Sequence, residues 1–119
     1  MTVLAVLPGK APERMELDGS LESMQKFVGG TIQALYPFSD PVAIVCNDDG
    51  KLMGLDYNRA LRDDDGNIYD ILCGSFFVCG LGEEDFVSLP ENLLRKYAQR
   101  FRHPELFLRI GENLMVVPF

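Results

Sequence analysis

Short apolar runs separated by turn signals constrain the fold of this chain more than any other feature of its sequence. Residues 2–7 are apolar and β-branched and precede Pro8-Gly9, and residues 42–46 precede Asn47-Asp48-Asp49-Gly50. Such runs have the length of strands and fall far short of the roughly 20 apolar residues that a membrane-spanning helix needs. We therefore expect a protein built largely of short strands, located in the cytoplasm and not in a membrane.

Two segments break this pattern and predict amphipathic helices. The first follows the N-cap signal of Ser20 and ends at Gly29-Gly30, and the second begins at Ser88-Leu89-Pro90-Glu91, which has capping-box spacing, and ends before His103-Pro104. Their apolar residues recur at helical spacing: Leu21, Met24, Phe27 and Val28 in the first, and Leu89, Leu93, Leu94, Tyr97, Ala98 and Phe101 in the second.

The remaining apolar runs predict further strands. They cover residues 14–17, 31–36, 68–72, 75–80, 106–110 and 114–117. The Asp-Gly turns at residues 47–50 and 63–67 also predict that residues 51–55 return along residues 42–46, and that residues 68–72 form the second arm of a hairpin. The expected fold is a single α+β domain over residues 1–119, with a largely antiparallel or mixed sheet of short strands and two amphipathic helices packed on it.

Charge and cysteine content exclude several classes of protein. The net charge is −7, and residues 1–90 hold 15 acidic against 6 basic side chains. An acidic body disfavours direct nucleic-acid binding, because each phosphate contact needs a cationic side chain. Cys46, Cys73 and Cys79 form no CxxC pair and lie in apolar runs, so we expect three buried thiols and no zinc site.

The run Asp63-Asp64-Asp65-Gly66-Asn67 is the stretch that most resembles a metal or catalytic site. If Gly66 takes the sixth position of a calcium loop, Leu61 and Leu72 fall at the first and twelfth positions, where neither side chain can bind a cation. Adjacent acids at a polar turn are normally all ionised, which does not suit acid–base catalysis. We interpret the run as a turn and expect no metal and no cofactor.

Catalytic motifs are also missing from the sequence. There is no Gly-x-Ser-x-Gly motif, and His103 is the only histidine that could serve as a base. We therefore expect a protein that is not an enzyme.

Candidate binding residues come instead from polar and aromatic side chains at the ends of predicted strands. Asn58 and Arg59 occupy a predicted loop where no turn rule requires them, and Tyr69 lies nearby in sequence. Tyr36 and Phe38 flank a proline at another strand end, where an alternative role is to cover the edge of the core. Binding groups are common on loops of a rigid scaffold, so we assign these five residues to recognition of a protein or small-molecule partner.

An ordered set of segments resembles a known family. The segments run from Asp18 to Gly30, from Tyr36 to Phe38, from Cys46 to Leu55, from Asn58 to Leu61 and from Tyr69 to Phe77. Together they resemble the domain of unknown function 3846, with a family-like core over about residues 2–85 and a C-terminal helix and hairpin beyond it. The resemblance implies a small accessory protein of bacteria, their phages or conjugative elements, and it transfers no activity.

Two hypotheses of function follow from the sequence and this setting. In the first, the protein is a noncatalytic binding module whose loop at Asn58 and Arg59 contacts the partner. In the second, it is an acidic decoy that imitates DNA, because residues 40–85 hold 11 acidic and 3 basic side chains, a net charge of −8. The decoy requires carboxylates spaced like phosphates over one face, which clusters at turns need not provide.

Overall fold

The computed structural model describes residues 1–118, which form two helices and a set of antiparallel strands. The elements are β1 (Thr2–Val6), β2 (Glu13–Glu16), α1 (Leu21–Val28), β3 (Ile32–Leu35), β4 (Val42–Asn47), β5 (Tyr57–Arg62), β6 (Ile68–Cys73), β7 (Phe76–Leu81), β8 (Phe86–Val87), α2 (Glu91–Arg100), β9 (Glu105–Ile110) and β10 (Asn113–Pro118). The expected α+β class is confirmed. No helix among residues 1–118 is long and apolar enough to cross a membrane.

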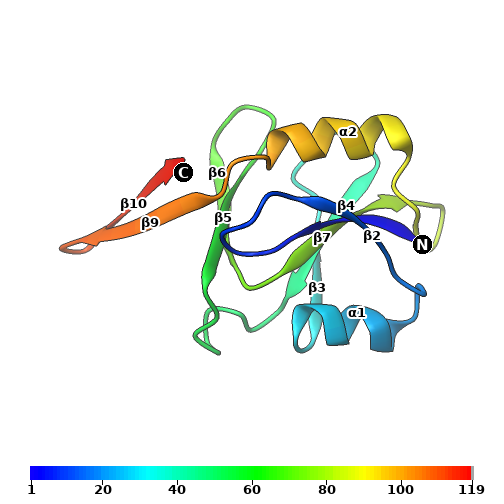
Figure 1. The fold of residues 1–119 in the computed structure, drawn as a ribbon, viewed down its shortest axis with the longest axis horizontal. Coiled ribbons are helices and arrows are strands. Elements are labelled where there is room, and N and C mark those ends of the chain that lie inside the picture. The colour runs from blue at the N-terminus through cyan, green and yellow to red at the C-terminus, as the bar shows by residue number, and fades with distance from the viewer. Residues whose placement is uncertain (119) are drawn as a thin grey trace.

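The main sheet has the strand order β2-β1-β7-β4-β3, and β8 pairs with β7. Its central strands are buried on both faces, so their side chains point alternately into two apolar clusters and not into core and solvent. In β4, for example, Val42 and Ile44 point to one cluster, while Ala43 and Val45 point to the other. Helix α2 covers the first face and α1 covers the second, so the sheet lies between the two helices (Figure 1).

Helix α1 begins and ends as the sequence predicts. The Ser20 side chain accepts a hydrogen bond from the amide of Ser23 at 3.0 Å, and Gly29 ends the helix with a φ of 81°. That left-handed conformation is one that side chains other than glycine rarely adopt. Asp18 supports the cap by accepting from the Ser20 amide at 2.8 Å. Hydrogen bonds from the side chain and the amide of Ser20 lower the pKa of Asp18 to about 2.

Helix α2 forms where expected, but the predicted capping box is wrong. Pro90 directly precedes the helix, and no side chain caps it. Ser88 instead accepts a hydrogen bond from the amide of Thr2 at 2.9 Å, which ties the approach to the helix to β1. The predicted apolar stripe does pack on the sheet, with Leu93, Leu94 and Tyr97 all buried.

The predicted return strand at residues 51–55 is also wrong. Residues 48–54 form turns, because β4 already has two sheet partners, β3 and β7, and no edge remains for a third strand. Gly50 lies so close to β6 that an added Cβ would be 2.7 Å from the carbonyl oxygen of Cys73. The loop that follows β4 therefore packs against the end of β6.

Two hairpins complete the fold outside the main sheet. Residues 68–73 form β6 after the acidic turn, as predicted, and pair with β5, whereas β9 and β10 form the predicted C-terminal hairpin. The β9–β10 hairpin extends from the body at one end of the molecule's long axis (Figure 1). The three cysteines are free and buried, as expected from their apolar surroundings.

Candidate binding surface

Asn58 and Arg59 lie inside the protein, so their predicted position in a loop is wrong. Both belong to β5, with exposed fractions of 0% and 1%. The Asn58 side-chain amide donates to the carbonyl of Val6 at 2.9 Å and to that of Gly74 at 2.8 Å. Its oxygen accepts from Arg59 at 2.9 Å. Asn58 thus joins β5 to the end of β1 and to the turn before β7.

The Arg59 guanidinium is surrounded by carbonyl groups. It donates to the carbonyl of Phe101 at 3.0 and 3.3 Å, to that of Lys10 at 2.6 Å, and to the backbone and side-chain oxygens of Asn58. Burial lowers its pKa, and the nearby Glu105 opposes that effect. Phe101 ends α2, where the negative end of the helix dipole favours a cation. Arg59 therefore connects β5 to the end of α2, and its donors are occupied within the protein.

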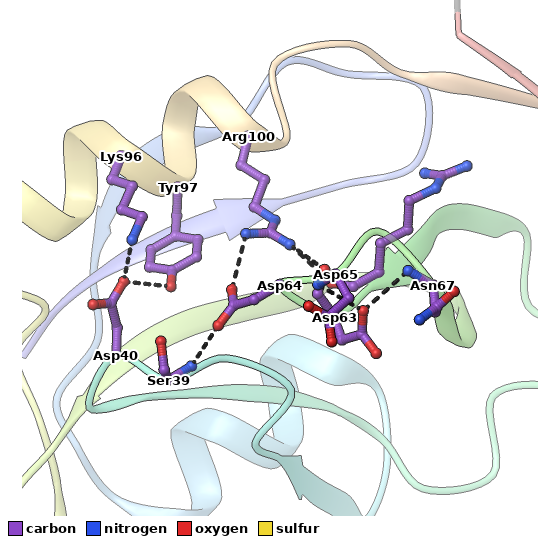
Figure 2. Close-up of polar contacts among 10 residues, drawn as sticks. Ser39, Asp40, Asp63, Asp64, Asp65, Asn67, Lys96, Tyr97 and Arg100 are labelled. Carbon is purple, nitrogen blue, oxygen red and sulfur yellow. Dashed lines mark hydrogen bonds and ion pairs between the residues drawn. The ribbon is translucent and has the colours of Figure 1, made fainter.

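The acidic turn is held against α2 by backbone and side-chain bonds. Figure 2 shows Asp63 accepting from the amides of Asp65 and Asn67, and Asp64 accepting from the amide of Ser39. The bond from Ser39 is the main reason why the pKa of Asp64 is lowered. Arg100 donates to the Asp63 carbonyl at 2.9 Å and to the Asp64 carboxylate at 3.5 Å. These carboxylates close a turn, in agreement with the prediction.

Phe38 belongs to the core beneath this turn. It is 8% exposed, and its ring lies 4.9 Å from that of Tyr97 and 4.3 Å from the Arg100 guanidinium. Tyr97 in turn donates to Asp40 at 2.8 Å (Figure 2). Burial, followed by the bond to Asp40, raises the pKa of Tyr97, and a hydrogen bond from Lys96 is the main cause that lowers the pKa of Asp40. Phe38 therefore covers the edge of the core, which is the alternative to a binding role that its position in the sequence suggested.

Tyr36 and Tyr69 are exposed, but they lie on different elements. Tyr36 follows β3 and borders a shallow depression formed with residues 81–86, which include Glu83, Glu84 and Asp85. Tyr69 lies on β6, at a bulge in the β5–β6 pairing. No ring contact joins the two tyrosines within residues 1–118. The five predicted residues thus do not form one site.

A groove of about 650 Å³ lies beside the β5–β6 hairpin. Its lining comes from the loop after β4, from both strands of the hairpin and from β10: Lys51, Gly54, Leu55, Asp56, Tyr57, Ile68, Asp70, Ile71, Cys73 and Leu114. Ile68 is 55% exposed and Tyr57 is 39% exposed. Leu61 and Leu72 of the hairpin belong to the apolar cluster that α2 also joins, and the hairpin forms a two-stranded sheet apart from the main sheet.

The rim of this groove is polar. Lys51 and Asp70 form an ion pair with a 2.5 Å contact, and the bond to Asp70 is the main cause that raises the pKa of Lys51. Asp70 also accepts from the amide of Ile71 at 2.8 Å. Apolar side chains surrounded by charged groups are the arrangement found in protein interfaces. The groove therefore combines exposed apolar side chains with charged groups at its rim.

The C-terminal hairpin contacts β5 beside the groove. Phe107 stacks on Tyr57 with ring centres 5.1 Å apart, and Arg109 donates to the Tyr57 hydroxyl at 3.3 Å. Glu105 accepts from the amide of Ala60 at 2.8 Å. These contacts between β5 and β9 set the position of Leu114, which lines the groove from β10.

A smaller cavity of about 310 Å³, with several charged side chains in its lining, borders β5, the end of α2 and the acidic turn. Three arginines line it, but each is already engaged: Arg59 with carbonyls, Arg62 with Glu105, and Arg100 with the acidic turn. Within residues 1–118, no group of three or more His, Cys, Asp or Glu side chains is arranged to hold a metal ion. The groove beside β5–β6 is thus the better candidate for binding.

Comparison with known proteins gives a family and no activity. The model of the family described as "Domain of unknown function (DUF3846)" matches residues 1–102. The match continues through α2, beyond residues 2–85, and ends before β9 begins at Glu105. No curated protein and no solved structure matches the chain.

Proposed function

The chain belongs to the DUF3846 family, and we propose that it is a noncatalytic binding module whose groove beside β5–β6 takes an apolar segment of a partner protein. The observation that carries this proposal is the exposure of Tyr57 and Ile68 at a groove of about 650 Å³. That volume is within the roughly 300–1,000 Å³ of typical ligand sites. The family resemblance adds the setting, an accessory protein of bacteria or their mobile elements.

The charges around the groove favour a basic flank on the partner. Asp56 and Asp70 line the groove, and Lys51 is its only cationic lining residue among those described. Because Lys51 is already paired with Asp70, the Asp56 carboxylate is left for the partner, and the whole chain carries a net charge of −7. A segment with apolar side chains next to Lys or Arg would match the groove in both shape and charge.

Side chains, and not added strands, are expected to mediate this binding. Ala60 and Ile71 face each other across the β5–β6 hairpin, and their amides are bonded to Glu105 and Asp70, respectively. A peptide that joins a sheet edge needs such amides free. A carboxylate occupies one such amide on each strand and disfavours strand addition at that point, so the partner is expected to insert side chains into the groove.

Selection from a peptide library tests the proposal. Peptides displayed on phage are selected on the immobilised protein, and their affinities are measured by fluorescence anisotropy. Ile68→Glu should weaken binding by about 10- to 100-fold, the effect of losing one buried aliphatic contact. Leu21→Glu, a change at a 56% exposed position on α1, is the matched control and should bind like the wild type. Equal binding by the wild type and Ile68→Glu would show that the groove is not the site.

The acidic decoy is a second candidate, and it rests on the net charge of −8 over residues 40–85. Three of those acids, Asp40, Asp64 and Asp70, form ion pairs with Lys96, Arg100 and Lys51. Such pairing reduces the negative charge available to imitate phosphates. Decoy binding to a DNA enzyme should collapse as salt is raised, and salt-insensitive binding would exclude this candidate.

A further inference from the structure

The β9–β10 hairpin exposes an apolar face that no other element of residues 1–118 covers. Five side chains on that face, Leu106, Leu108, Ile110, Met115 and Val117, are between 37% and 59% exposed. The register places Leu106 opposite Val117 and Leu108 opposite Met115, so these side chains share one side of the hairpin. We call this set the hairpin face.

The opposite side of the same hairpin is already occupied. Phe107 stacks on Tyr57, and Leu114 lines the groove beside β5–β6. The hairpin is therefore apolar on both sides, with one side covered by its own chain. A two-stranded sheet is marginally stable in water unless further strands or another layer cover its apolar surface. The hairpin face thus lacks the layer that such a sheet needs.

The charge of the hairpin suits a second copy of the chain. Two molecules with a net charge of −7 repel one another in general, but residues 105–118 carry only Glu105, Arg109 and Glu112. Glu105 is bonded to the Ala60 amide and to Arg62 within its own chain. The opposite charges of Arg109 and Glu112 then cancel, so two hairpins can meet without like-charge repulsion.

The area also fits self-association. Five aliphatic side chains at about half exposure present on the order of 400 Å², within the roughly 300–600 Å² of the largest apolar patch on a typical monomer. Two such faces, with the surrounding backbone and the hairpin tip, approach the lower limit of about 1,200 Å² for a specific interface. An interface at that limit is weak, with a dissociation constant in the micromolar range.

We propose that the hairpin face is a self-association surface, on which two copies stack around a two-fold axis. At such an axis each patch meets itself, so the central pair of Leu108 and Met115 contacts its equivalent in the second copy. Leu106 then lies over Ile110 of the other molecule. The surface lies outside the family-matched residues 1–102 and is distinct from the groove, so it does not depend on the function proposed above.

Sedimentation equilibrium of the full chain from about 5 to 500 µM tests the proposal, since that range brackets a micromolar constant. The mass should rise with concentration from 13.3 kDa toward twice that value. Leu108→Glu should remain monomeric throughout, because it places two carboxylates together at the axis. Leu21→Glu, which changes an exposed leucine on α1, should associate like the wild type. Circular dichroism verifies that each variant is folded.

A charge-swap pair makes the test specific to the two-fold arrangement. Leu108→Glu and Leu108→Lys should each be monomeric alone and should associate when mixed, because opposite charges then meet at the axis. A wild type that stays monomeric at the highest concentration overturns the proposal, as does unchanged association of Leu108→Glu. Binding of the monomeric wild type to vesicles of zwitterionic and anionic lipid would assign the hairpin face to a membrane and also overturn it. Peptide binding in the groove should be unchanged in Leu108→Glu.

Discussion

Replacing Arg59 tests the interpretation that this residue connects the fold internally. Arg59→Met keeps much of the side-chain volume and removes the guanidinium. The Phe101 carbonyl and the side-chain oxygen of Asn58 then lose a donor in the interior, and the Lys10 carbonyl loses one at a half-buried position. Each unsatisfied buried acceptor costs about 1–3 kcal/mol, and relief of the buried charge offsets part of the sum.

The expected loss in the free energy of unfolding is about 3–5 kcal/mol, a large fraction of the roughly 5–15 kcal/mol of a typical domain. Urea denaturation monitored by circular dichroism measures this loss. An m value equal to that of the wild type would show that both proteins undergo the same unfolding transition. The free energy of unfolding of Arg59→Lys should lie between those of the wild type and Arg59→Met, because the lysine ammonium retains the charge but lacks the five donors of the planar guanidinium. Arg102→Met, at an exposed position, is the control and should stay within about 0.5 kcal/mol of the wild type. A loss below about 1 kcal/mol for Arg59→Met would refute the reasoning.

Three further predictions follow from the loop after β4, the cap of α1 and the buried thiols. Gly50→Ala should lower the free energy of unfolding by about 1–3 kcal/mol, measured in urea, because the new Cβ would meet the Cys73 carbonyl oxygen at 2.7 Å. The pKa of Asp18 is lowered to about 2, so its stabilising effect is fully present above the ordinary pKa of 3.8 and is lost as the pH falls toward 2. When the free energy of unfolding is measured against pH, Asp18→Asn should lack this part of the decline in acid. Burial raises the pKa of Cys46 to about 11 and that of Cys79 to about 12, so a thiol reagent at pH 8 should label both only after unfolding, and rapid labelling of the native protein would contradict this.

Local signals in the sequence were sufficient for the helices, for the acidic turn before β6 and for the C-terminal hairpin. Ser20 and Gly29 define the ends of α1 through bonds to residues close in sequence, so pattern and structure agree. The Asp-Gly turn between β5 and β6 is local in the same way. The capping box at Ser88 failed because a distant amide, that of Thr2, competes for the same hydroxyl. Helix ends and turns completed within a few residues were predicted well, whereas the capping box at Ser88 and the return strand at residues 51–55 failed because distant segments take their place.

The candidate site depends on contacts that the sequence does not show. Asn58 and Arg59 were assigned to the surface because polar side chains usually lie there, whereas their partners are carbonyls up to 52 residues away along the chain. One signal was present, since both residues directly precede the apolar pair Ala60 and Leu61. The groove was missed because it needs the loop after β4, the β5–β6 hairpin and Leu114 to meet in space.

The pattern of apolar residues in the C-terminal hairpin likewise did not indicate which of its two sides is exposed. Leu106 and Leu108 alternate with Phe107, so both sides of β9 are apolar in the sequence. Contacts of Phe107 and Arg109 with Tyr57 distinguish the covered side from the free one.

Mapping a selected peptide on the protein by NMR tests the central claim most directly. Backbone amide shifts of the isotope-labelled protein are followed as the peptide is added to saturation. The largest changes should fall on residues that line the groove, with Tyr57, Ile68, Ile71 and Leu114 among them. Changes centred instead on Tyr36 and the acidic residues 83–85, or on α1, would contradict the assignment of the groove as the binding surface.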